Sequence, residues 1–184
     1  MLLLEAPRRP LHVVAGKVFL WHQKHPCLAD LQKLAWDAGL VIILTTDASS
    51  EVGWGVTAGT VWHQGSWLPE ERDMSINWKE LKTYEHALIC LEEVLRDKLI
   101  FVKLDNSCAV HYINAGSGRI QLLADLAKCI RMRETRLGVE SVAVHLPGEK
   151  NVTADGLSRL PFSLTHCFPL LYCGSRHFSL HSLG

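Results

Sequence analysis

Hydrophobic and polar positions divide the chain into a patterned central region and two less regular ends. From residue 41 the run VIILTT is continuous and β-branched, which is typical of a buried strand, and it ends at Asp47. Residues 53–58 and 60–67 have the pattern of two further strands, and the short connection at Gly59 favours antiparallel pairing between them. The central region therefore begins with three consecutive strands.

Helical and strand patterns alternate after this triplet. Residues 77–95 carry apolar side chains at three- and four-residue steps, which predicts an amphipathic helix with Asn77 as its N-cap and Glu80 in the capping-box position. Further elements are expected in this order: a strand at 99–105, helices at 107–114 and 119–137, a strand at 139–146 and a helix at 151–159. The order implies an α/β fold, with a mixed sheet of three antiparallel strands followed by parallel strands and helices on both faces.

The two ends of the chain lack this regularity. Residues 1–39 mix prolines and arginines with one short amphipathic stretch at 29–40, and we expect them to form an N-terminal extension. Residues 40–160 are the expected folded domain, and residues 161–184 are an expected irregular or disordered tail. No hydrophobic run is long enough to span a bilayer, and the apolar start is interrupted before it reaches secretory length. We therefore expect no membrane association and no secretion.

Composition restricts the partners of the chain. Its 184 residues are 48% hydrophobic and 21% charged, which is a globular composition, and 19 basic residues balance 19 acidic ones. Because no overall field attracts nucleic acid, such an attraction must be local. One basic cluster, within residues 117–136, fits either phosphate contacts or a solvated helix face; it consists of Arg119, Lys128, Arg131, Arg133 and Arg136. Six cysteines without a C-x-x-C pair favour reduced thiols in an intracellular protein.

Four carboxylates fall where such a sheet brings side chains together. Asp47 and Asp105 end two strands that would be parallel neighbours, Glu80 lies in the first turn of the long helix, and Asp155 opens the last helix. Each acid alone is explained as a helix cap or a solvated end, but clustered carboxylates repel one another unless cations neutralise them. Oxygen ligands suit Mg²⁺ or Mn²⁺, and two such ions about 3.5 to 4 Å apart can assist hydrolysis of a phosphodiester.

The motifs around these acids carry a family resemblance. The segments TTDASSEVGWGV, NWKEL, KLDNSCAVHYIN and HLPGEKNVTADGLSR resemble, in this order, the motifs of the type 1 ribonuclease H domain of retroelement polyproteins. They are most similar to those of tyrosine-recombinase (DIRS-like) retrotransposons. The resemblance covers about residues 40–160 and implies the ribonuclease H-like fold, with a five-stranded sheet.

The resemblance also implies an activity and a set of site residues. The expected function is a metal-dependent endonuclease that hydrolyses the RNA strand of RNA/DNA hybrids in retroelement reverse transcription. Two Mg²⁺ ions, or Mn²⁺ in their place, would be held by four catalytic acids, Asp47, Glu80, Asp105 and Asp155, with Asp47 bridging both ions. Five polar residues match positions that contact nucleic acid: Ser49, Asn77, Asn106, Asn151 and Arg159. For Asn77 and Arg159, a helix N-cap and a helix C-terminal cation are the structural alternatives.

One auxiliary position is ambiguous. Cellular and many retroviral members of the family carry a mobile histidine before the last aspartate that assists product release. Counting back ten residues from Asp155 reaches His145, whereas an alignment on Pro147 and Gly148 places Glu149 there. We favour Glu149, because residues 139–146 have the pattern of a strand, which would hold His145 rigidly.

Partners and competing functions follow from the same motifs. No polymerase Y-x-D-D motif occurs, and the N-terminal segment is similar to the linker after a polymerase, so we expect a reverse transcriptase region of the same polyprotein as partner, beside the hybrid. Reverse transcription intermediates place the chain in the cytoplasm or nucleus. The alternative is a catalytically silent ribonuclease H-like nucleic-acid-binding or spacer module derived from a retroelement. Transposase or resolvase chemistry on DNA is disfavoured by the ADGLSR ending.

Overall fold

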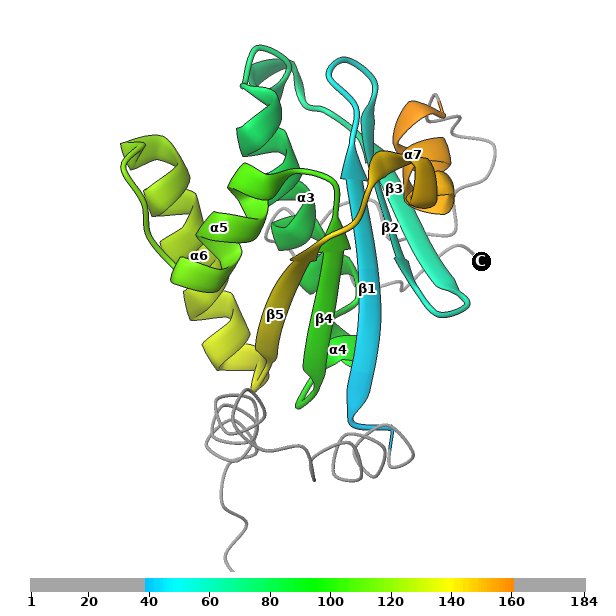
Figure 1. The fold of residues 1–184 in the computed structure, drawn as a ribbon, viewed down its shortest axis with the longest axis vertical. Coiled ribbons are helices and arrows are strands. Elements are labelled where there is room, and N and C mark those ends of the chain that lie inside the picture. The colour runs from blue at the N-terminus through cyan, green and yellow to red at the C-terminus, as the bar shows by residue number, and fades with distance from the viewer. Residues whose placement is uncertain (1–38, 161–184) are drawn as a thin grey trace, which may run out of the picture.

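The described part of the chain, residues 39–160 of a computed structural model, is built on one five-stranded sheet (Figure 1). Its strand order is β3-β2-β1-β4-β5. The first three strands pair antiparallel, while the last two run parallel to the first; the strands are β1 (Val41–Ala48), β2 (Gly53–Ala58), β3 (Val61–Ser66), β4 (Leu99–Leu104) and β5 (Glu140–His145). The mixed α/β sheet expected from the sequence is confirmed.

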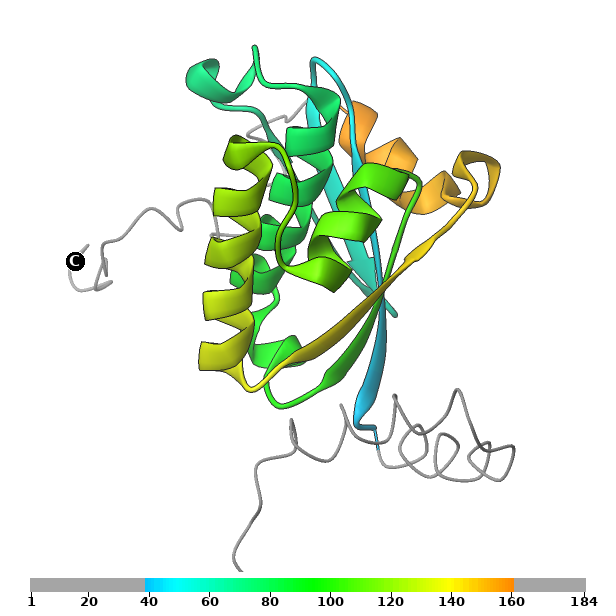
Figure 2. The same ribbon diagram turned by 60° about the vertical axis from the view of Figure 1, so that its left-hand side comes forward.

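Helices cover both faces of this sheet (Figures 1 and 2). The principal helices are α3 (Ile76–Cys90), α5 (Ser107–Ala115), α6 (Gln121–Leu137) and α7 (Val152–Arg159). In β2, Trp54 stacks on His86 of α3, whereas its neighbour Gly55 lies against α7. Because successive strand residues point to opposite faces, α3 and α7 lie on opposite sides of the sheet. Three short helices, η2 (Pro69–Glu71), α4 (Glu92–Leu95) and η3 (Gly148–Lys150), complete the described elements.

Residues 1–38 and 161–184 lie outside the described part of the chain. With them lie the expected N-terminal extension, its amphipathic stretch up to residue 38, and the expected C-terminal tail. Among residues 39–160, no helix has both the length and the apolar character needed to cross a membrane.

The start of α3 differs from the sequence expectation. The side chain of Ser75 accepts a hydrogen bond from the backbone N–H of Trp78 at 3.3 Å, so the N-cap is Ser75 and the expectation for Asn77 was wrong. Both residues are good capping types, and sequence alone did not choose between them. As a result Glu80 lies in the second helical turn, where it has no capping role.

The helix expected over residues 77–95 is also interrupted. Leu91 has φ −109° and ψ 19°, outside helical geometry, and it separates α3 from the short α4. Leu91 and Leu95 are both buried, so the apolar period continues through the break. A periodic pattern reports which side chains are buried, and it does not report a local change in backbone direction.

Tryptophan side chains contribute to the core at three positions. Trp54, Trp67 and Trp78 are buried in the core. Trp62 lies on β3, a strand at the edge of the sheet, and is 57% exposed. An edge strand has a neighbour on one side only, which leaves a large side chain with fewer contacts.

A buried acid links α6 to α3 and β5. Glu134 is 1% exposed, and its carboxylate accepts hydrogen bonds from the Tyr84 hydroxyl at 2.8 Å and from the Ser141 hydroxyl. Arg131 forms an ion pair with it at 2.9 Å. Burial raises the pKa of Glu134, and these donors and the positive charge oppose that shift. The Ser141 hydroxyl therefore has a buried carboxylate partner.

We expect His86 to make stability depend on pH. Its ring lies 4.7 Å from that of Trp54, and burial is the main cause that lowers its pKa from 6.5 to about 4. Its contribution to stability is therefore full above pH 6.5 and is lost progressively as the pH falls from 6.5 to about 4. Relative to the His86→Gln variant, the wild type should lose about 2 kcal/mol between pH 7.5 and pH 5. Urea unfolding at both pH values measures the difference, and equal losses in the two proteins would contradict it.

Candidate metal centre

Three of the four expected acids meet at one edge of the sheet. One carboxylate oxygen each from Asp47, Glu80 and Asp105 lies within 4.8 Å of the other two. Asp47 is near the end of β1, and Asp105 follows β4 directly. The parallel register that sets Thr45 opposite Lys103 brings these two strand ends together. Asp47 and Glu80 are buried, whereas Asp105 is exposed at the surface of the cluster.

Glu80 is held at the cluster by the anchoring of the first turns of α3. The neighbouring side chain, Lys79, is 2% exposed. Its ammonium group donates to the backbone oxygen of Arg72 at 2.6 Å and to that of Ser50. The bond to Ser50 ties the helix to the turn that follows β1, which places Glu80 close to Asp47.

Burial and mutual repulsion disfavour charge on this cluster. Burial raises the pKa of Asp47 to about 6. The hydrogen bond from Ser158 opposes this shift, and the charges of Asp105 and Asp155 add to it. Burial followed by the charges of Asp47 and Asp105 raises the pKa of Glu80 to about 9. Such groups either bind protons or require a cation beside them.

The donor set fits a hard divalent cation. All three converging groups are carboxylates, which are preferred ligands of Mg²⁺ and Mn²⁺. The Oε2 atom of Glu80 is buried and has no hydrogen-bond partner. A buried carboxylate oxygen without a donor is costly, and a bound cation would satisfy it.

Asp155 is not part of this group of three. Its Oδ1 atom accepts from the Nε atom of Arg159 at 2.6 Å, and this pair is partly exposed. Its charge nevertheless raises the pKa of Asp47, so it lies near the cluster. This ion pair within α7 agrees with the structural alternative for Arg159, a cation near the C-terminal end of the helix.

Two side chains of the α7 region hold Asp47. The Nδ2 atom of Asn151 donates to Oδ1 of Asp47 at 3.1 Å and to the backbone oxygen of Thr46 at 3.0 Å. The hydroxyl of Ser158 donates to Oδ2 of Asp47 at 2.6 Å. Asn151, expected to contact nucleic acid, is 1% exposed. Ser158 was missed, although its position three residues after Asp155 places both on one helix face.

The other expected polar contacts are distributed between the interior and the surface. Ser49 is buried, and its hydroxyl bonds to Gly53 within the β1–β2 turn. Asn106 caps α5 by accepting from the backbone N–H of Ala109 at 2.9 Å. Its Nδ2 atom also donates to Oδ1 of Asn77 at 2.9 Å. Asn77 and Asn106 are therefore hydrogen-bonded to each other and partly exposed. In the sequence, Asn106 follows Asp105 and Asn77 precedes Glu80 by three residues.

The loop before α7 borders the cluster. His145 is the last residue of β5, is exposed, and has its Nε2 atom 3.1 Å from the backbone oxygen of Asp105. Glu149 is exposed in η3. A Cβ atom at Gly148 would lie 3.0 Å from Oδ2 of Asp105, so this loop passes close to the acid. Auxiliary roles for His145 and Glu149 stay predictions.

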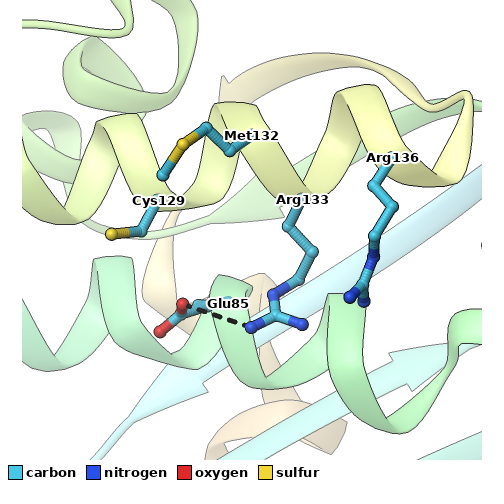
Figure 3. A pocket seen from close by; sticks show the side chains of 5 residues that line it. All are labelled: Glu85, Cys129, Met132, Arg133 and Arg136. Carbon is cyan, nitrogen blue, oxygen red and sulfur yellow. Dashed lines mark ion pairs between the residues drawn. The ribbon is translucent and has the colours of Figure 1, made fainter.

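Two basic residues of α6 pair with acids of α3 and α4 and not with the acidic cluster. Arg133 pairs with Glu85 at 3.7 Å, and Arg136 pairs with Glu92 at 3.5 Å. Together with Cys129 and Met132, Glu85 and the two arginines line a pocket between α3 and α6 (Figure 3). The pocket shares no residue with the acidic cluster. These ion pairs agree with a solvated helix face, which is one of the two alternatives left open for this basic segment.

Comparisons with known proteins agree with this architecture at the level of the fold. No protein-family model matches the chain, and no curated protein matches its sequence. Ribonuclease H1 from the halophilic archaeon Halobacterium salinarum is similar, with a TM-score of 0.51 and 18% identity over 64% of this chain and 93% of that chain. An N-terminal RNase H domain from Mycobacterium tuberculosis gives 0.52 and 14% identity, over 64% and 90%. The chain therefore has the ribonuclease H-like fold.

The repulsion in the cluster predicts a stability effect in the absence of metal. In EDTA at pH 8, Asp47→Asn should be at least as stable as the wild type, by up to about 3 kcal/mol, because it removes a charge whose pKa is raised. A raised carboxyl pKa costs stability as the pH rises through about 6, so the advantage should shrink at pH 5. Thermal unfolding measures both values. A clear loss of stability in the variant at pH 8 would show that the cluster is not under electrostatic strain.

Proposed function

We propose that this chain is a metal-dependent ribonuclease H that hydrolyses the RNA strand of RNA/DNA hybrids. The observation that supports this most is the convergence of Asp47, Glu80 and Asp105 on a ribonuclease H-like sheet. A binding module without catalysis has no need to bury two mutually repelling carboxylates, which cost stability in the absence of a cation. The family motifs quoted from the sequence supply the substrate class.

The cluster residues divide the work of holding metal. Asp47, Glu80 and Asp105 are the proposed ligands, with Asp155 as the fourth acid nearby. Divalent ions such as Mg²⁺ or Mn²⁺, when bound, stabilise charge on the phosphodiester and lower the pKa of water. Asp47 is oriented from the α7 side, Glu80 contributes an unpartnered oxygen, and Asp105 is open to an arriving strand. We propose that the site would hold two ions and that Asp47 would be one of their ligands.

Recognition of RNA is proposed for the exposed amides beside these acids. Asn77 and Asn106 are partly exposed and hydrogen-bonded to each other, and Asn106 directly follows Asp105. Amide groups both donate and accept, which suits contacts with the 2′-hydroxyl that distinguishes RNA from DNA. Hybrid binding would then depend on backbone shape and sugar chemistry, with no requirement for base sequence.

The biological setting is proposed from the motifs. We propose that residues 40–160 are the ribonuclease H domain of a retroelement polyprotein, similar to DIRS-like elements, or of a protein descended from one. Its partner would be a reverse transcriptase region of that polyprotein, and it would act where reverse transcription intermediates occur, in the cytoplasm or nucleus. The flanking residues 1–39 and 161–184 would be an extension and a tail.

A substrate panel tests the proposed function. Purified protein is incubated with Mg²⁺ and one of three labelled substrates: an RNA/DNA hybrid, single-stranded RNA, or duplex DNA. Cutting of the RNA strand in the hybrid alone is the expected result. Hybrid binding without cutting would instead assign the silent module, and cutting of duplex DNA alone would assign transposase-like chemistry.

A further inference from the structure

The hydroxyl of Ser158 makes the shortest polar contact that Asp47 receives. It lies 2.6 Å from Oδ2 of Asp47 and 2.9 Å from the backbone oxygen of Asp155. A serine has one proton to donate, so these two acceptors compete for it. Bonds to an ionised acceptor are shorter and about twice as strong as neutral ones, which favours Asp47 as the partner when its carboxylate is charged.

The approach of α7 to the sheet fixes the position of this hydroxyl. A Cβ atom at Gly55 would lie 2.6 Å from the backbone oxygen of Ala154 and 2.9 Å from the backbone nitrogen of Ser158. The helix backbone therefore rests on a residue without a side chain. Ser158 is 0% exposed, and its hydroxyl has no solvent with which to exchange its partner.

Asp47 is consequently held at both carboxylate oxygens. Asn151 donates to Oδ1, and Ser158 donates to Oδ2. A carboxylate has about four lone-pair positions, so one bond to each oxygen leaves a position on each for a cation. The two donors fix the rotation of the carboxylate, while the charges of Asp105 and Asp155 oppose its ionised form.

We infer that Ser158 is a positioning residue of the metal centre, which orients Asp47 for cation binding through its hydroxyl. This inference rests on the proposed function only in taking Asp47 as a metal ligand. Groups that hydrogen-bond a ligand from outside typically change metal affinity by about 10- to 100-fold when removed. Ser158 acts through Asp47 and need not touch metal or substrate.

Calorimetric titration of Mn²⁺ into the full-length, metal-free protein tests the inference. Ser158→Ala should weaken Mn²⁺ binding by about 10-fold or more. Ser158→Thr, which restores the hydroxyl, should bind Mn²⁺ more tightly than Ser158→Ala. Ser141→Ala is the matched control, because it removes a hydroxyl from another buried carboxylate, Glu134, outside the cluster. It should leave Mn²⁺ affinity within about twofold of the wild type. It thereby controls for the general cost of losing a buried hydrogen bond between a serine and a carboxylate.

Two results would overturn the inference. One is wild-type Mn²⁺ affinity in Ser158→Ala, and the other is an equal loss in Ser158→Ala and Ser141→Ala, which would indicate general destabilisation. Cleavage of a labelled hybrid by the wild type is measured in parallel. A wild type that binds Mn²⁺ with the expected dependence on Ser158 but leaves hybrids intact would refute the proposed function and retain the positioning role.

Discussion

Replacing Asp47 with asparagine is expected to lower the rate of RNA-strand cleavage by at least about 10³-fold. Asparagine has nearly the same shape but no negative charge, so it is a poor ligand for Mg²⁺. Metal stabilisation of a phosphodiester transition state is worth several kcal/mol, and each 1.36 kcal/mol corresponds to about tenfold in rate. Asn151 and Ser158 donate to the two carboxylate oxygens of Asp47, and neither of these neutral side chains can supply the lost negative charge.

The control for this variant is Asp125→Asn. Asp125 is exposed on α6, where it pairs with Lys128 at 3.3 Å, and it lies outside the acidic cluster. Exposed pairs of this kind contribute little, so cleavage should stay within about twofold of the wild type. Single-turnover rates at saturating Mg²⁺ measure both variants. If Asp47→Asn kept more than about a tenth of the wild-type rate, Asp47 would not be an essential ligand.

Gly55→Ala should have the second largest effect, because Gly55 of β2 lies against α7, the helix that carries Ser158 and Asp155. The added methyl group would lie 2.5 Å from the Cβ atom of Leu157 and 2.6 Å from the backbone oxygen of Ala154. A clash with backbone atoms cannot be relieved by rotating a side chain, so α7 as a whole must shift. Overpacking of this kind costs about 1–3 kcal/mol of unfolding free energy. A displacement near 1 Å of positioned groups can lower the rate by about 10²-fold.

Gly156→Ala supplies the comparison within the same helix. A Cβ atom there meets nothing within 4 Å. The same methyl group on the outer side of α7 should be neutral or stabilising by about 1 kcal/mol, since alanine favours helix more than glycine. Urea unfolding and hybrid cleavage are measured for both variants. Equal behaviour of Gly55→Ala and Gly156→Ala would show that close packing of α7 on β2 does not support the site.

Sequence patterns predicted the parts of this molecule that depend on periodicity. Buried strands such as β1 and β4 have continuous apolar runs, and the acids that end them could be located before the sheet was known. Parallel pairing of adjacent strands then brings Asp47 and Asp105 to one edge. The convergence of Glu80 followed from its place early in the helix between them, even though the capping role expected for it was wrong.

The features that sequence did not predict depend on single contacts. Ser75 and Asn77 are both capable N-caps, and only the path of the chain into α3 selects Ser75. Asn151 was expected to contact nucleic acid, yet it is buried against Asp47. Ser158 lies in α7, and the close packing of this helix on β2 depends on Gly55. This is a tertiary contact that no local sequence pattern predicts. Such side-chain partners become visible only when the elements are packed.

The most direct test of the proposed function is the initial rate of RNA-strand cleavage in a labelled RNA/DNA hybrid, with Mg²⁺ and with EDTA. Wild type and Asp47→Asn are compared at equal concentrations, after circular dichroism has shown that both are folded. Cleavage by the wild type in Mg²⁺ alone, with loss of cleavage in Asp47→Asn, is the predicted result. Cleavage that persists in EDTA or in the variant, or its absence from a folded wild type that binds the hybrid, would contradict the account.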